Sequence, residues 1–188
     1  MGAAALKMED LPHYTYDHYV QWEGRWEIIN GLPYAMTPAP AIEHQDLCVD
    51  IVFQLKSLLQ DCRKCKVLLP VDWQISEDTV VQPDVLVVCG DLENIKGNKL
   101  LIPPVLVFEI LSPSTIKKDR GLKYRLYRAA GVKYYCMVDP ETRSADVFEL
   151  RGEDKYIEKE DFREGKVTFD LGVCKIAFDF AEIFKGTS

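Results

Sequence analysis

One short segment constrains the fold of this chain more than any other. Residues 105–111 read VLVFEIL, which is apolar on both alternating faces except for Glu109. Such a run is typical of a strand that is covered by other layers on both sides. An ionised carboxylate there costs several kcal/mol unless a cation or hydrogen bonds compensate for the lost water. Glu109 is therefore the first candidate functional residue, and the alternative is a salt bridge to a helix at the rim of the sheet.

The rest of the chain alternates between helical and strand periodicities. Helices are expected over 15–22, 41–64 and 115–130, with a last helical turn in FDFAEIF. Strands are expected on both sides of Asn30-Gly31 and over 67–75 and 80–89. Four more are expected in YYCMVD, SADVFEL, KYIEKE and KVTF, and a loop or short helix is expected over 91–102. This order predicts an α/β fold, with a mixed sheet flanked by helices and extra antiparallel strands on the N- and C-terminal sides. The length of 188 residues predicts one domain over 1–188.

The charge balance excludes a protein that coats nucleic acid. Lys and Arg number 23 against 30 Asp and Glu, which gives a net charge of -7. Generic phosphate binding needs a cationic surface, but an enzyme can meet phosphates through a bound cation. No stretch approaches the ~20 apolar residues of a membrane span, and no secretory signal is recognisable, so we expect a cytoplasmic protein without a membrane partner.

The six cysteines are expected to be reduced thiols, as is usual in a chain without a secretory signal. They lie at positions 48, 62, 65, 89, 136 and 174. Cys62 and Cys65 have CxxC spacing, but no second Cys pair or His pair follows to complete a zinc site. A thioredoxin-like role would place the motif at the start of a helix, whereas here it falls at the expected end of one.

Asp84 begins the apolar strand DVLVVC directly after Pro83. If this strand neighbours that of Glu109, the two carboxylates lie side by side near one edge of the sheet. They would then repel each other unless a metal ion lay between them, and Mg²⁺ is commonly held by one or two carboxylates. The pair predicts a divalent-metal site for phosphodiester hydrolysis. Without metal, Asp84→Asn is expected to keep or raise the stability.

Basic residues are concentrated after Glu109, opposed only by Asp119. They are Lys117, Lys118, Arg120, Lys123, Arg125, Arg128 and Lys133. Such a cluster is an electrostatic footprint for a phosphate backbone, and the alternative is a solvated helix face. For Lys123 we favour function.

Several of these motifs resemble the Uma-two family, which consists of proposed endonucleases of the restriction-endonuclease-like PD-(D/E)XK superfamily. The resemblance lies in RWEIINGLPYAMTPAP, EHQ, VVQPD, EILSPST, DRGLKYRLY, AGVKYYCMVDP and AEIF, and it extends over nearly the whole chain. It implies a restriction-endonuclease-like core in which Asp84 and Glu109 hold Mg²⁺, with Mn²⁺ as a substitute, for cleavage of nucleic acid. By analogy with related nucleases, the backbone carbonyl of Ile110 is a further metal ligand.

One position departs from the wider superfamily. The usual Lys two residues after the Glu is Leu111 here, and leucine cannot polarise a water or steady a phosphate. In Uma-two-like sequences this position is typically apolar, and the helix lysine matching Lys123 is the natural replacement. Lys123 is thus the expected catalytic cation.

Other candidates are weaker. Glu27 matches a family position and is a candidate third carboxylate or a strand residue that faces water. His44 lies on a helical apolar stripe. It is therefore either a histidine packed in the core or one that binds the substrate. Gln82 is a candidate for orienting a metal-bound water, against a plain strand hydrogen bond. Lys117 and Arg120 are candidate substrate-binding cations.

Two functions remain open. The first is a Mg²⁺-dependent endonuclease that hydrolyses DNA, or another nucleic acid, and acts as a homodimer because cutting both strands is simplest with two sites. The second is a binding or regulatory module that kept the fold but lost the chemistry, and Leu111 keeps this alternative open.

Overall fold

The computed structural model describes residues 11–36, 40–90, 95, 97–152, 155–162 and 165–185. Its centre is a six-stranded sheet in the order β11-β10-β9-β8-β6-β3, in which only β8 and β9 are parallel. The strands are β3 (Cys65–Leu68), β6 (Val85–Cys89), β8 (Leu106–Ile110), β9 (Tyr134–Asp139), β10 (Ser144–Arg151) and β11 (Lys155–Phe162). The mixed α/β architecture is therefore confirmed, and β8 is buried along its whole length, as its composition predicts.

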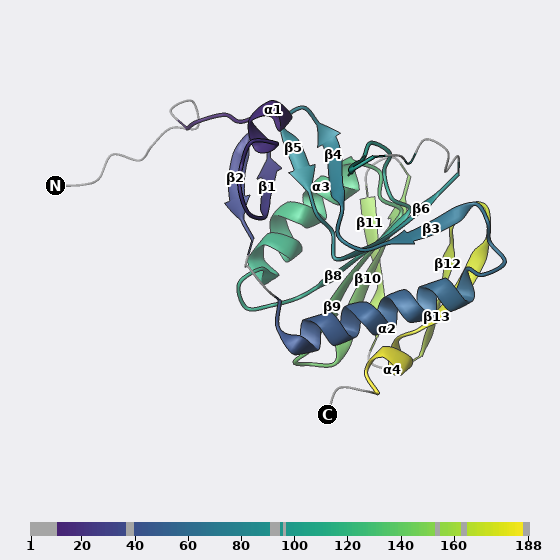
Figure 1. The fold of residues 1–188 in the computed structure, drawn as a ribbon. Coiled ribbons are helices and arrows are strands. Elements are labelled where there is room, and N and C mark those ends of the chain that lie inside the picture. Colours follow the sequence, from purple (N-terminus) through teal and green to yellow (C-terminus); the bar gives the residue numbers. More distant parts are fainter. Residues whose placement is uncertain are drawn as a thin grey trace.

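Two smaller sheets flank this centre (Figure 1). One has the order β2-β1-β5-β4-β7 and the other is a ribbon of β12 and β13. Their strands are β1 (Trp26–Ile29), β2 (Leu32–Ala35), β4 (Asp72–Ser76), β5 (Thr79–Val81), β7 (Lys99–Leu100), β12 (Lys166–Asp170) and β13 (Lys175–Asp179). Asn30 and Gly31 both have positive φ in the β1–β2 turn, which explains the hairpin signal at that dipeptide.

Helices cover both faces of the central sheet. They are α1 (Tyr16–Tyr19), α2 (Ile42–Leu58), a π-helical segment η3 (Lys118–Lys123) that continues into α3 (Tyr124–Ala129), and α4 (Phe180–Ile183). Side chains of α2, β12 and β13 form one hydrophobic core with one face of β6, β8 and β9. Side chains of α3 and β4 pack on the opposite face, and no helix of the described residues is long and apolar enough to cross a membrane.

Prolines account for two wrong strand expectations. The segment 67–75 divides into β3 and β4 around Pro70, and the segment 80–89 divides into β5 and β6 around Pro83. Proline cannot donate a ladder hydrogen bond, so each strand ends there and the chain passes into another sheet. Helix α2 also ends at Leu58 rather than 64, and of the segment 91–102, residues 91–94 and 96 lie outside the described residues.

The expectation of six reduced thiols is wrong for four cysteines. Cys62 is bonded to Cys174 and Cys65 to Cys89, while Cys48 and Cys136 are free. Contacts between distant segments decide this pairing, and the spacing of cysteines along the sequence does not reveal them. Cys65 and Cys89, for example, are partners across the antiparallel strands β3 and β6.

Candidate active site

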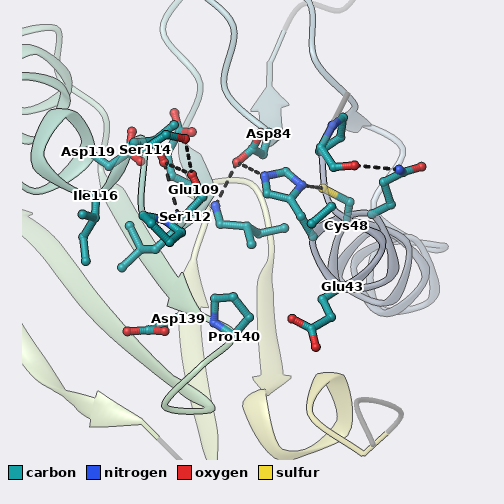
Figure 2. A pocket seen from close by; sticks show the side chains of 18 of the residues that line it. Glu43, Cys48, Asp84, Glu109, Ser112, Ser114, Ile116, Asp119, Asp139 and Pro140 are labelled. Carbon is teal, nitrogen blue, oxygen red and sulfur yellow. Dashed lines mark hydrogen bonds and ion pairs between the residues drawn. The ribbon is translucent and has the colours of Figure 1, made fainter. Parts of the chain in front are cut away.

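Asp84 and Glu109 meet at the junction of β6 and β8. These strands are antiparallel neighbours with Val85 opposite Phe108, so the next step of the same register brings Asp84 opposite Glu109. The adjacency expected from the sequence is present. Both side chains line a cavity of about 700 Å³ between the start of α2, the end of β8 and η3, and Figure 2 shows them turned toward one another.

The Asp84 carboxylate is held by two donors. Its Oδ2 accepts a hydrogen bond from the backbone N–H of Ile110 at 2.9 Å and lies 3.2 Å from Nε2 of His44. Burial alone would raise the pKa of Asp84, but His44, Lys123 and the Ile110 N–H together hold it below its usual value. Asp84 is therefore an anion at neutral pH.

Among the described residues, hydrogen-bond donors to the Glu109 carboxylate contact one of its two oxygens. Oε1 accepts hydrogen bonds from Nζ of Lys123 at 2.9 Å and from the hydroxyl of Tyr127 at 2.6 Å. Burial, assisted by Asp84, Asp119 and Glu27, raises the pKa of Glu109 well above its usual value in spite of Lys123. Its charge is thus only partly compensated by the protein.

Lys123 lies at the centre of the carboxylates. Its side chain is 3% exposed, and its Nζ lies 3.1 Å from Glu27 and 3.7 Å from Asp119, in addition to the contact with Glu109. Burial would lower the pKa of Lys123, but these carboxylates hold it well above its usual value. The residue is a permanent cation, and the alternative of a solvated helix face does not hold for it.

Glu27 is fully buried on β1 and does not face water. It accepts hydrogen bonds from the backbone N–H of Gln82 at 3.0 Å and from Lys118 at 2.6 Å. Burial would raise the pKa of Glu27, but Lys123, Lys118 and the Gln82 N–H hold it below its usual value. Glu27 thereby links the small N-terminal sheet to Lys123.

The site as a whole has an excess of negative charge when its carboxylates are ionised, although burial, which raises the pKa of Glu109 and of Asp119, opposes the ionisation of these two. Four carboxylates (Glu27, Asp84, Glu109 and Asp119) surround two ammonium groups (Lys118 and Lys123). Oδ1 of Asp84 and Oε2 of Glu109 accept no hydrogen bond from any described residue, and Oδ1 of Asp119 is buried without one. The arrangement can therefore accept a divalent cation. Outside the cysteines, no three metal-binding side chains of the described residues cluster closely, so such an ion would have about two side-chain ligands.

Comparison with known proteins assigns the chain to a family. Residues 16–171 match the Uma2 family, whose description is "Putative restriction endonuclease". The chain belongs to the Uma2 family. A crystal structure of a "putative nuclease belonging to DUF820" from Anabaena variabilis has the same fold, with a TM-score of 0.71 and 19% identity over 91% of this chain and 97% of that one. An "Uncharacterized protein" of Synechocystis sp. is 33% identical over 123 residues, which cover 62% of this chain and 63% of that protein, less than two thirds of it.

In this Uma2 protein the lysine beside Glu109 comes from a helix. Leu111, at the usual lysine position, is 3% exposed and packs in the core below α3. Lys123 reaches Glu109 instead, from the end of η3. The lysine replacement expected from the family resemblance is thus geometrically possible.

The remaining sequence candidates are placed differently. His44 lines the cavity through its contact with Asp84. Gln82 does not reach the cavity, because its side-chain amide contacts Arg25, Tyr19 and Asp72. Lys117 is exposed and Arg120 pairs with Asp146 at 2.6 Å, and neither lines the cavity. Ile110 lines the cavity, and its described polar contact there is the N–H bond to Asp84.

Sequence reasoning missed three side chains of the site. Lys118 was noted only as part of the basic cluster, although it pairs with Glu27 at 2.6 Å. The sequence identifies Asp119 only as the acid within the basic cluster, although it is buried beside Lys123. Tyr127 follows Lys123 by four positions, so helical spacing could have placed both on the face turned to Glu109.

Proposed function

We propose that this Uma2 protein is a Mg²⁺-dependent endonuclease that hydrolyses phosphodiester bonds in DNA. The observation that carries the proposal is the pair of neighbouring carboxylates, Asp84 and Glu109, with the buried ammonium of Lys123 at 2.9 Å from Glu109. The family description supports the reaction class.

Asp84 and Glu109 would hold the metal ion through their unpaired oxygens. This donor set fits Mg²⁺, because hard oxygen ligands suit the ion and because the excess negative charge of the site matches its two positive charges. When bound, Mg²⁺ supplies a polarised scissile phosphate and a water of lowered pKa. The proposal includes the backbone carbonyl of Ile110 as a third ligand of the metal ion.

Lys123 acts as a fixed positive charge. Because its pKa is held well above the usual value, its Nζ keeps its proton at neutral pH and cannot accept one from the attacking water. It neutralises the negative charge that develops on the phosphate in the transition state. Glu27, Asp119 and Tyr127 position it, since all three contact either Nζ or the oxygen that Nζ binds.

DNA binding on a protein with a net charge of -7 would depend on the metal and on the few exposed cations near the cavity. Lys117 and Arg120 lie on the exposed side of the segment that carries Lys123, where a phosphate backbone leaving the cavity could reach them. We include a homodimer in the proposal, since two sites would allow both strands to be cut.

The test is cleavage of supercoiled plasmid with Mg²⁺ or Mn²⁺, with EDTA as the blank. We expect the wild type to convert the plasmid to open and linear forms, and Asp84→Asn and Glu109→Gln to leave it supercoiled. Lys56→Ala is the matched control, because it removes an exposed lysine of α2 that does not line the cavity. Cleavage of a single-stranded RNA under the same conditions, with plasmid left intact, would change the substrate class.

The competing function is a binding module without catalysis. If the wild type cuts no nucleic acid and its thermal stability is unchanged by metal, while it retards DNA in a gel, that function replaces the proposal. The raised pKa of Glu109 argues against it, because an ionised Glu109 without a metal destabilises the fold.

A further inference from the structure

Four cysteines from four separate segments meet away from the active site. Cys62 follows α2, Cys65 begins β3, Cys89 ends β6 and Cys174 lies in the turn between β12 and β13. Figure 1 shows these segments converging at the end of α2, on the side of the ribbon of β12 and β13. None of the four lines the cavity of the active site.

The two sulfur pairs form one cluster rather than two separate bridges. Besides the bonds Cys62–Cys174 and Cys65–Cys89, the Sγ of Cys65 lies 3.6 Å from that of Cys62 and 3.9 Å from that of Cys174. Thiolates around a tetrahedral zinc ion, with a Zn–S bond of about 2.3 Å, are about 3.8 Å apart. The sulfur atoms of Cys62, Cys65 and Cys174 all lie within 4.8 Å of one another, and the two separations from Cys65 match the edges of a tetrahedral zinc–thiolate site. Cys89 joins these three through its bond to Cys65.

The local backbone and charge also suit such an ion. The N–H of Cys65 donates to the carbonyl of Cys62 at 3.0 Å, so the CxxC segment is a tight turn that presents both sulfurs on one side. A zinc ion with four thiolates carries two net negative charges. Basic residues outnumber acidic ones among the sequence neighbours of the cysteines: Arg63, Lys64, Lys66 and Lys175 are basic and exposed, and Asp61 is the acid.

We propose that Cys62, Cys65, Cys89 and Cys174 bind one structural Zn²⁺ in the reduced protein. The second ligand pair that the CxxC motif lacks in sequence is supplied by Cys89 and Cys174 through the fold. The ion would fasten the ribbon of β12 and β13, which shares no ladder with the central sheet, to β3, β6 and the end of α2.

The disulfide and zinc forms are two states of the same four sulfurs. A dithiol reductant supplies two electrons and two protons to each disulfide and is itself oxidised to a disulfide. The four thiols then lose their protons to solvent as the zinc ion binds, which makes binding dependent on both reductant and pH.

The test is metal analysis of the full chain. The protein is expressed with added zinc, purified with a phosphine reductant and no chelator, and its zinc content is measured by elemental analysis and native mass spectrometry. We expect one zinc per chain, release of that zinc by an organomercurial, and a thiolate-to-metal charge-transfer band after substitution with Co²⁺. Oxidised protein is expected to be zinc-free and lighter than the reduced chain by four hydrogens.

Variants separate this site from other zinc ligands. Cys62→Ser and Cys174→Ser should each reduce the bound zinc well below one per chain, whereas Cys136→Ala should retain it, because that thiol lies in the core outside the cluster. A reduced wild type that stays zinc-free after incubation with Zn²⁺ would overturn the proposal. So would full zinc content in both serine variants. The wild-type measurement decides the question even if a variant fails to fold.

Discussion

At the scale of single residues, Lys123 has the strongest expected effect on the reaction. Its ammonium lies 2.9 Å from Glu109 and 3.1 Å from Glu27, and its side chain, which is 3% exposed, lines the cavity. Lys123→Ala removes the fixed charge at the phosphate, so we expect the cleavage rate to fall by about 10²–10³-fold while metal affinity is largely kept. The rate is measured by plasmid nicking and the affinity by calorimetry with Mn²⁺.

The control for Lys123→Ala is Lys56→Ala, which removes an equal charge from an exposed position of α2 outside the cavity. Because Lys123→Ala leaves buried carboxylates without a partner, a destabilisation of about 3–5 kcal/mol is also expected, and the assay is run well below the unfolding temperature. Undiminished cleavage by the variant would mean that another cation, such as Lys118, supplies the charge.

Glu109 and Asp84 are expected to differ in their effect on stability without metal. The raised pKa of Glu109 means that its ionised form is disfavoured in the folded protein, so its contribution to stability falls as pH rises from 4.5 toward its folded pKa. Glu109→Gln should therefore keep or raise the free energy of unfolding in EDTA at neutral pH. The free energy of unfolding is measured with urea at several pH values in this range. The variant should lack the decrease in this free energy with rising pH that ionisation of Glu109 causes in the wild type.

The same reasoning reverses the sequence-based expectation for Asp84→Asn. Like-charge repulsion suggested no loss of stability, but the pKa of Asp84 is lowered by His44, Lys123 and the Ile110 N–H, so its anion is favoured in the fold. We expect a loss of about 1–3 kcal/mol for Asp84→Asn in EDTA. Equal stability of the two variants would show that the two carboxylates are not held as differently as their contacts indicate.

At the scale of elements, local signals were reliable where the deciding interactions are local. Three elements can each be predicted from their own residues. They are the Asn30-Gly31 turn, the apolar strand β8 and helix α2 with its helical spacing. The errors arose where a strand looked continuous although proline had interrupted it, at Pro70 and Pro83. Strand β13 was not expected at all, because its alternation is hidden between Cys174 and the apolar segment FDFAEIF.

That unexpected strand contributes a large part of one core. Phe178 of β13 is fully buried, and its ring centroid lies 5.2 Å from that of Phe108 and 5.0 Å from that of Phe180. Phe178→Ala is expected to lower the free energy of unfolding by about 3–5 kcal/mol through lost burial and the cavity left behind. The urea midpoint measures this loss. Val173→Ala, at an exposed position before the same strand, should stay within about 0.5 kcal/mol of the wild type, and a similarly small effect at Phe178 would mean that the ribbon is not part of the core.

At the scale of the whole molecule, the sequence predicted the pair of carboxylates but not their surroundings. Asp84 and Glu109 could be found because the first directly precedes an apolar strand and the second interrupts one, and a charge in such a place needs compensation. Glu27 and the four clustered cysteines gave no comparable signal. Their environment is created by segments that are distant in sequence, such as β12–β13 against β3, and a single sequence does not record which segments meet.

At this scale, metal binding is the property that the carboxylates and ammonium groups of the active site predict most directly. An ion that binds only the folded state adds a free energy of RT ln(1 + [L]/Kd), which is about 2.7 kcal/mol at a concentration of 100 Kd. For a chain of this size, the expected rise in Tm is roughly 5–10 °C. The measurement is thermal unfolding of EDTA-treated protein with increasing Mg²⁺ or Mn²⁺. Asp84→Asn and Glu109→Gln should lose most of this rise, while Lys117→Ala should retain it. An equal rise in Tm for all four proteins would place the ion elsewhere and remove the main physical support for metal-dependent cleavage.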